Sequence, residues 1–252
     1  MASASGGVQS IERAVGLLEA VARNESDSGS GMALSQLAAV SGLPLPTIHR
    51  LVRTLVGLGY LRQEPSRAYA LGPRLLVLTE SATTMLTSVS RPHLTALVDD
   101  LGETANLARL DGDRVVYVAQ VPSRHAMRMF TEVGRRVMLH CTAVGKALAA
   151  NLAPDRARAL FEGAGMPAQT EHTVTDPDQL LGQLAWVREH GYALDDGEQE
   201  IGVRCVAVTV PEVAVGLALS VSGPAARMGN DVVQQAVPLL RQAATALAAD
   251  LT

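Results

Sequence analysis

Five polar side chains with hydrogen-bond donors recur along residues 46–58, at positions that a helix would turn away from its apolar face. These side chains are Thr47, His49, Arg50, Arg53 and Thr54. The apolar residues between them follow spacings of three and four, namely Ile48, Leu51, Val52, Leu55 and Leu58. Guanidinium, imidazole and hydroxyl groups can donate to phosphate oxygens and to base edges. The pattern therefore predicts a helix that contacts nucleic acid.

The residues before this stretch supply a second helix that would hold it in place. Leu37 lies on that earlier helix, which Ser41-Gly42 ends, because glycine accepts the left-handed backbone of a tight turn. Pro46 restricts Leu45 to extended conformations, so the next helix is predicted to begin at Pro46. Two helices joined by a short turn form the core of a helix-turn-helix.

A predicted hairpin follows the second helix. Residues 60–63 and 68–71 have the composition of short strands, and residues 64–67 have that of a turn. Arg62 and Arg67 would lie on this hairpin. The order of elements over residues 34–71 is that of a winged helix-turn-helix. The alternative is a helix and hairpin that serve only as a protein contact surface.

The distribution of charge supports nucleic-acid binding better than the net charge does. The whole chain carries a formal charge of -4. Residues 45–74, however, hold five arginines against Glu64 alone, a balance of +4, whereas residues 91–252 hold 14 basic and 19 acidic residues, a balance of -5. A basic module on an acidic body is expected when one part neutralises phosphates and the other has a different role.

Length and composition indicate a folded protein of two domains. The chain has 252 residues, of which 48% are hydrophobic and 18% are charged, enough for a sizeable core. It contains no apolar run of about 18 residues, and Met1 to Gln9 lacks the regions of a signal peptide. We therefore expect a cytoplasmic protein with no membrane partner.

The two cysteines, Cys141 and Cys205, are too few for a disulfide framework. Together with His125 and His140 they could converge on zinc, but the four residues are not clustered in sequence, and buried structural cysteine is the commoner case. We expect no metal and no other cofactor. A cysteine nucleophile with His140 as its base is the enzymatic alternative.

The order of predicted helices and loops divides the chain into two domains and a linker. Residues 2–9 should form a tail, Ser10 should cap a helix over residues 11–21, and residues 24–31 should form a loop. A linker helix is expected over Pro73 to Val89, where Arg91-Pro92 interrupts it. The predicted parts are a DNA-binding domain over 1–72, the linker over 73–89 and a second domain over 90–252.

The second domain has an α+β pattern. A helix is expected over residues 93–101, and strands over 105–110 and 115–120 flank the turn Asp111-Gly112-Asp113. Further strands and helices follow to the end of the chain. This order favours a largely antiparallel sheet covered by helices.

Two segments of this domain have the chemistry of a carboxylate site. In the run Thr142 to Lys146 a strand meets a helix start, where free N–H groups and the positive end of the helix dipole favour an anion. Ser220 and Ser222 share one face of a strand and can each donate a hydroxyl. Lys146 is expected to point to solvent, and Gly145 to permit close packing.

The chain resembles the IclR family of bacterial transcriptional regulators over nearly its whole length. The resemblance is carried by SIERAVGLLEAV, LSQLAAVSGLPLPTIHRLVRTLVGLGYL, LHCTAVGKALAA, YALDDGEQEIGVRCVAV and LALSVSGPAARM. It implies a winged helix-turn-helix, a linker helix and a C-terminal effector-binding domain with a GAF-like α+β fold and an antiparallel sheet.

The resemblance also implies site residues in the C-terminal domain. Ala143 and Val144 occupy positions that offer backbone contacts to the effector, and Val144 replaces a smaller residue of some members. Asp195, Val203 and Cys205 match an acid, an aliphatic residue and a cysteine that line the effector pocket. Val203 and Cys205 also share one face of a strand by period-two alternation. The acidic residues Asp196, Glu198 and Glu200 are expected to be solvated.

The function predicted from these features is that of a DNA-binding transcriptional regulator, a repressor before an activator. Its partners would be double-stranded operator DNA and a small carboxylate effector, and it would act as a homodimer or homotetramer. The alternatives are the cysteine-dependent enzyme fused to a helix-turn-helix, and a ligand-independent DNA-binding protein.

Overall fold

A computed structural model describes residues 7–129, 131–213 and 215–252 of the protein. The chain forms two compact units, one up to Thr83 and one from Thr84 onward. The boundary lies within α4 (Arg74–Leu101). Residues 2–6 of the predicted tail lie outside the described residues. Within the described part of the chain, no helix combines the length and the apolar character needed to cross a membrane.

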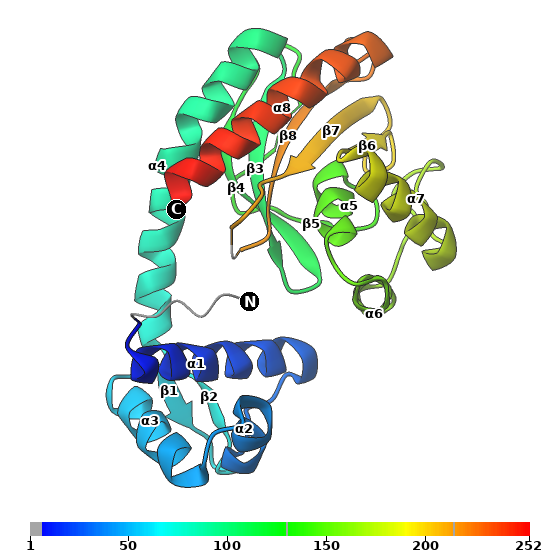
Figure 1. Cartoon of the computed structure of the whole chain (residues 1–252). Coiled ribbons are helices and arrows are strands. Elements are labelled where there is room, and N and C mark those ends of the chain that lie inside the picture. The colour runs from blue at the N-terminus through cyan, green and yellow to red at the C-terminus, as the bar shows by residue number, and fades with distance from the viewer. Residues whose placement is uncertain (1–6, 130, 214) are drawn as a thin grey trace. The chain divides into compact units, whose positions relative to one another are not determined.

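The first unit is a winged helix-turn-helix (Figure 1). Its elements are α1 (Gln9–Ser28), α2 (Leu34–Ser41), α3 (Leu45–Gly57), β1 (Leu61–Gln63) and β2 (Tyr69–Leu71). Gly42 ends α2 with φ 65°, and its N–H donates to the Ala38 carbonyl, as the predicted glycine turn requires. Gly72 brings the chain past Gly59 so closely that a Cβ atom would lie 2.2 Å from the Gly59 oxygen.

Helix α1 differs from its prediction at both ends. It begins at Gln9, and no side chain caps it, because the N-cap residue is Val8, which has no polar side-chain atom. Ser10, predicted as the cap, is instead the second residue of the helix. The helix also continues to Ser28 through the residues predicted as a loop. There the Asn24 side chain donates to the Ser30 carbonyl at 2.7 Å, and Gly29 closes the helix with φ 66°. The polar residues therefore terminate the helix and do not replace it. Helix α3 likewise starts one residue early, at Leu45.

The second unit is built on a six-stranded antiparallel sheet in the order β5-β4-β3-β8-β7-β6. The strands are β3 (Thr104–Asp111), β4 (Arg114–Val121), β5 (Arg136–Met138), β6 (Ala193–Asp196), β7 (Val203–Thr209) and β8 (Leu217–Pro224). The helices are the second half of α4, α5 (Ala143–Ala150), α6 (Pro154–Ala164), α7 (Pro177–His190) and α8 (Asn230–Leu251). The predicted α+β class and the hairpin around residues 111–113 are confirmed.

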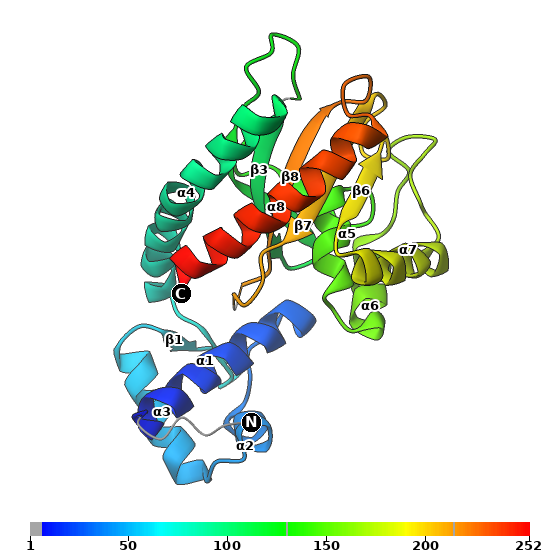
Figure 2. The same cartoon turned by 45° about the horizontal axis from the view of Figure 1, so that its top comes forward.

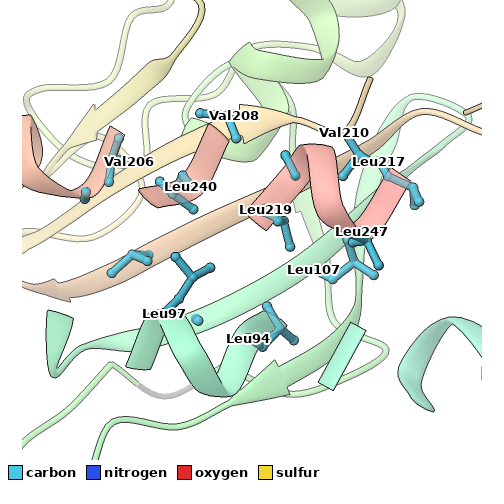
Figure 3. Close-up of a cluster of buried hydrophobic side chains, with 14 of the residues drawn as sticks. Leu94, Leu97, Leu107, Val206, Val208, Val210, Leu217, Leu219, Leu240 and Leu247 are labelled. Carbon is cyan, nitrogen blue, oxygen red and sulfur yellow. The ribbon is translucent and has the colours of Figure 1, made fainter. Parts of the chain in front are cut away.

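Helices cover both faces of this sheet. Helix α8 and the second half of α4 lie on one face, and α5, α6 and α7 lie on the other (Figure 2). Figure 3 shows the first layer, in which Leu94 and Leu97 of α4 and Leu240 and Leu247 of α8 pack against Leu219 of the sheet. The alternation of β8 sends Leu219 into this layer and its neighbours Ser220 and Ala218 to the opposite face.

The predicted interruption at Arg91-Pro92 is wrong, because α4 continues through Pro92 to Leu101. Proline removes one helical hydrogen bond and usually kinks or breaks a helix. Here Leu94, Leu97 and Val98 are buried directly after the proline, and the Ser90 hydroxyl donates to the Thr87 carbonyl at 3.3 Å. Burial of the apolar face on the C-terminal side outweighs the lost hydrogen bond.

Candidate functional site

The outer face of α3 presents the polar residues that the sequence pattern placed there. His49, Arg50, Arg53 and Thr54 are exposed and Thr47 is partly exposed, whereas Ile48, Val52 and Leu55 are buried. Leu58, predicted on the apolar face, is exposed because α3 ends one residue before it. Among the described residues, neither Arg50 nor Arg53 forms a salt bridge. Both guanidinium groups are therefore available to an anionic partner.

The hairpin adds two arginines to this unit. Arg62 is exposed on β1 but forms a salt bridge with Glu64 at 3.1 Å, so part of its charge is already neutralised. Arg67 is exposed at the tip of the turn, where it adopts the left-handed conformation with φ 66°. Among the described residues, Arg67 forms no salt bridge, so its positive charge is less neutralised than that of Arg62.

In the second unit, one cavity brings together all seven residues predicted to bind the effector. It lies between the sheet face that α5 covers and the first turn of that helix. Its lining comprises the predicted Ala143, Val144, Asp195, Val203, Cys205, Ser220 and Ser222, together with Thr142 of the predicted anion-binding run and with Tyr117, Met129, Gln199 and Glu200, which were not predicted to line it. The cavity is small, with a volume of about 20 Å³.

The first turn of α5 forms one wall of this cavity, which is called the effector cavity below after the predicted role of its residues. Thr142 caps the helix: its hydroxyl oxygen accepts from the Gly145 N–H at 3.1 Å, and the hydroxyl donates to the Met138 carbonyl at 2.7 Å. Among the described residues, no acceptor reaches the N–H groups of Ala143 and Val144. Two free donors at the positive end of a helix dipole are suited to a carboxylate.

The opposite wall is the sheet, where the two serines are fully buried. An extended amide network stands beside them: the Gln120 side chain donates to Asn106 Oδ1 at 2.9 Å, and Asn106 Nδ2 lies 3.4 Å from Ser220 Oγ and 3.5 Å from Ser222 Oγ. Because both serine oxygens face an amide donor, their own hydrogens can point elsewhere. Asn106 stands between the apolar residues Ala105 and Leu107 in β3, and a polar residue in that place is the signal that could have identified it.

Asp195 is the acidic group of the cavity and is only 2% exposed. Its Oδ1 atom accepts from the N–H groups of Glu198 at 2.8 Å and Gln199 at 3.3 Å. Burial raises the pKa of Asp195 from 3.8 to about 7, although these two hydrogen bonds favour the ionised form. Near neutral pH, Asp195 is therefore present both as a carboxylate, which would repel an anionic ligand, and as a neutral carboxylic acid, which can donate a hydrogen bond.

The prediction that Lys146 and Glu198 face solvent is wrong. Both are buried, at 4% and 7% exposure, and the Lys146 ammonium donates to the Glu198 carboxylate. Gln183 accepts a second hydrogen bond from Lys146 at 3.3 Å. A buried charge is tolerated when it is paired, which explains why each of the two residues can be enclosed. Asp196 and Glu200 are exposed, as predicted.

The two cysteines lack the environment of an activated nucleophile. Burial raises the pKa of Cys141 to about 12 and also raises the pKa of Cys205, so both thiols stay protonated at neutral pH. Cys141 donates to the Gln199 side chain at 3.1 Å, and His140 Nε2 pairs with the Pro167 carbonyl at 3.2 Å. Within the described residues, no group of three or more His, Cys, Asp and Glu side chains is arranged to hold a metal ion.

Comparison with known proteins agrees with this geometry in both units. Residues 10–65 match the IclR helix-turn-helix domain, and residues 81–249 match the bacterial transcriptional regulator IclR C-terminal domain. The acetate operon repressor of Salmonella typhimurium is 34% identical over 250 residues, which cover 96% of this chain and 90% of the repressor.

Solved structures give the same result. A transcriptional regulator from Rhodococcus sp. RHA1 superposes with a TM-score of 0.64 at 31% identity, covering 97% of this chain and 98% of its own. An IclR homologue from Microbacterium hydrocarbonoxydans, complexed with 4-hydroxybenzoate, gives 0.62 at 27% identity, covering 96% and 98%. A helix-turn-helix followed by this C-terminal domain, matched along nearly the full chain, places the protein in the IclR family of bacterial transcriptional regulators.

Proposed function

We propose that this DNA-binding regulator is a repressor whose operator affinity is controlled by a small carboxylate metabolite bound in the effector cavity. The observation that carries the proposal is the convergence of two free N–H groups of α5 with the hydroxyls of Ser220 and Ser222 around one cavity. Hydrogen bonds from such donors to an ionised acceptor are about twice as strong as bonds between neutral groups. The names of the acetate operon repressor and of the 4-hydroxybenzoate complex support both parts of the proposal.

Thermal stability of the purified protein across a panel of acids tests the effector class. The panel contains acetate, pyruvate and 4-hydroxybenzoate, each with its amide as a neutral control. A ligand that binds only the folded state raises its stability by mass action. We expect at least one acid, and not its amide, to raise the unfolding temperature of the second unit. Stabilisation by an amide as strong as by its acid would contradict a carboxylate effector.

Ser222→Ala should reduce the affinity for the active acid at least tenfold, since a hydrogen bond to a charged group contributes roughly 1.5–3 kcal/mol. Isothermal titration of the wild-type and variant proteins measures this loss. Ser88→Ala removes a hydroxyl from α4, outside the cavity residues, and serves as the matched control. Equal affinities of the wild type and Ser222→Ala would remove Ser222 from the binding site.

Val144→Ala should shift the preference of the cavity toward larger acids. The Val144 side chain narrows a cavity that is already small. Pockets discriminate by about 10- to 200-fold for a single methylene group. We therefore expect the affinity ratio of 4-hydroxybenzoate to acetate to rise at least tenfold in the variant, as measured by titration of both acids. An unchanged ratio would show that another wall sets the size limit.

Arg50→Ala should weaken operator binding by about tenfold or more, because one specific base or phosphate contact contributes roughly 1–3 kcal/mol. Fluorescence anisotropy with a labelled operator fragment measures this effect at fixed salt. Arg23→Ala, an exposed arginine of α1 outside the predicted contact set, is the control. Effector affinity should be unaffected in both variants. Unchanged operator affinity in Arg50→Ala would exclude this side chain from the interface.

Control of operator binding requires that the effector bind two states of the protein with different affinities. We propose that α4, which contains residues of both units, carries this difference. Operator titrations with and without the active acid test the coupling. Identical operator affinities under both conditions would leave a DNA-binding protein without effector control.

A further inference from the structure

A second and larger cavity opens on α7 and β6, with residues other than those of the effector cavity. Its volume is about 270 Å³, compared with about 20 Å³ for the effector cavity. Its lining consists of Lys146, Gln183, Trp186, Val187, Leu194, Asp196 and Glu198. A cavity of this size has room for a small organic molecule.

The polar end of this second cavity is the buried pair of Lys146 and Glu198. An ammonium group has three N–H donors, and two of them meet Glu198 Oε1 and Gln183 Oε1. The other carboxylate oxygen, Glu198 Oε2, is buried and accepts no hydrogen bond from the described residues. A buried oxygen without a partner costs free energy, and a suitable donor would relieve that cost. The pair thus keeps one donor and one acceptor unused.

The rest of the second cavity is largely apolar. Trp186 is 39% exposed, packs against His190 and Tyr192 and contributes an aromatic wall, and Val187 and Leu194 extend it. The charges of Lys146 and Glu198 cancel, while Asp196 at the rim forms a salt bridge with Arg204 at 3.3 Å. A neutral ligand therefore suits this cavity better than an ion does.

We propose that this cavity binds a neutral small molecule with an apolar body and one hydroxyl group. A hydroxyl both donates and accepts, so it can accept from Lys146 and donate to Glu198. The terminal torsion of a glutamate is soft, and a small rotation is enough to turn Oε2 toward the ligand. This assignment goes beyond the effector proposal and does not depend on it.

The position of the pair also connects the two cavities. Lys146 lies on α5 directly after the turn that contains Ala143 and Val144, and Glu198 directly precedes Gln199 and Glu200. Both segments form walls of the effector cavity. A hydroxyl ligand that changes the Lys146–Glu198 contact should therefore change effector affinity, and the effector should change the affinity of the hydroxyl ligand by the same factor.

Trp186 makes the second cavity directly observable. It is the single tryptophan of the chain and does not line the effector cavity. Its emission is to be followed during titration of the full-length protein with benzyl alcohol, benzyl methyl ether and benzylammonium. The ether lacks the donor, and the ammonium lacks the acceptor. We expect a saturable change with benzyl alcohol and at least tenfold weaker binding of the other two compounds.

A variant tests the residue assignment. Glu198→Gln replaces the unused acceptor by an amide and should weaken benzyl alcohol binding about tenfold, whereas Glu189→Gln makes the same change at an exposed site of α7 and should have no effect. The titrations of the wild type decide the proposal even if Glu198→Gln fails to fold. No saturable change, or equal affinity for all three compounds, would overturn it, and either result leaves the carboxylate proposal intact.

Discussion

Effector affinity should fall about tenfold for each pH unit above 7 and stay nearly constant below it. The pKa of Asp195 is raised to about 7 by burial in the effector cavity. Its protonated form can donate to a bound carboxylate, whereas its ionised form repels the ligand. Binding above pH 7 must therefore take up a proton. Titration calorimetry from pH 6 to 9, in buffers of different ionisation enthalpy, measures both the affinity and the proton uptake.

Asp195→Asn provides the control, because the amide oxygen can keep the N–H bonds from Glu198 and Gln199 without titrating. Its effector affinity should not depend on pH. The folded-state pKa of Asp195 lies above its value of 3.8 in the unfolded chain, so its contribution to stability is lost as the pH rises from about 4 to 7. The variant should thus be more stable than the wild type at pH 8 but not at pH 4. Affinity that stays constant from pH 6 to 9 in the wild type would contradict this role of Asp195.

Gly145→Ala should lower the free energy of unfolding of the second unit by about 3 kcal/mol or more. A Cβ atom at this position would lie 2.3 Å from the Leu139 oxygen and 2.5 Å from the Leu139 Cα atom. Both are backbone atoms, so α5 would have to move as a whole, and insertion of extra atoms into a packed core typically costs about 1–3 kcal/mol or more. Urea unfolding, followed by far-ultraviolet circular dichroism, measures the change.

Gly182→Ala is the matched control for Gly145→Ala. Gly182 lies inside α7, and a Cβ atom at this position would meet no atom of another described segment within 4 Å. Alanine is favoured over glycine in a helix by about 1 kcal/mol, so this variant should be slightly more stable than the wild type. If Gly145→Ala were equally stable, the close approach of α5 to Leu139 would not restrict this position.

The periodic parts of the fold could be predicted from the sequence, because burial of an apolar face determined them. The spacing of Ile48, Val52 and Leu55 predicted α3 to within one residue, and the alternation around Ser220 and Ser222 predicted that the two serines share one side of β8. The errors occurred where a local signal was too weak to end a helix. Helix α4 continues through Pro92 because its next turns are buried, and α1 continues through the polar residues after Asn24 until Gly29 ends it.

Some residues that line the effector cavity could likewise be predicted from the sequence, and others could not. Residues within a recognisable motif, such as Asp195 and Cys205, were predicted to line it, and the structure places them there. Tyr117 and Met129 come from segments far away in sequence, and nothing local indicates that they meet. Lys146 and Glu198 were misjudged for a related reason: two charged residues 52 positions apart can be buried when each neutralises the other.

The burial of Lys146 has a practical consequence for chemical labelling. Lys146 is the single lysine of the chain, and its ammonium group is enclosed by Glu198 and Gln183. An acylating reagent can reach this amine only through the second cavity, which Lys146 lines. The rate at which such a reagent modifies Lys146 therefore reports access to that cavity, and a ligand bound there should protect the lysine from acylation.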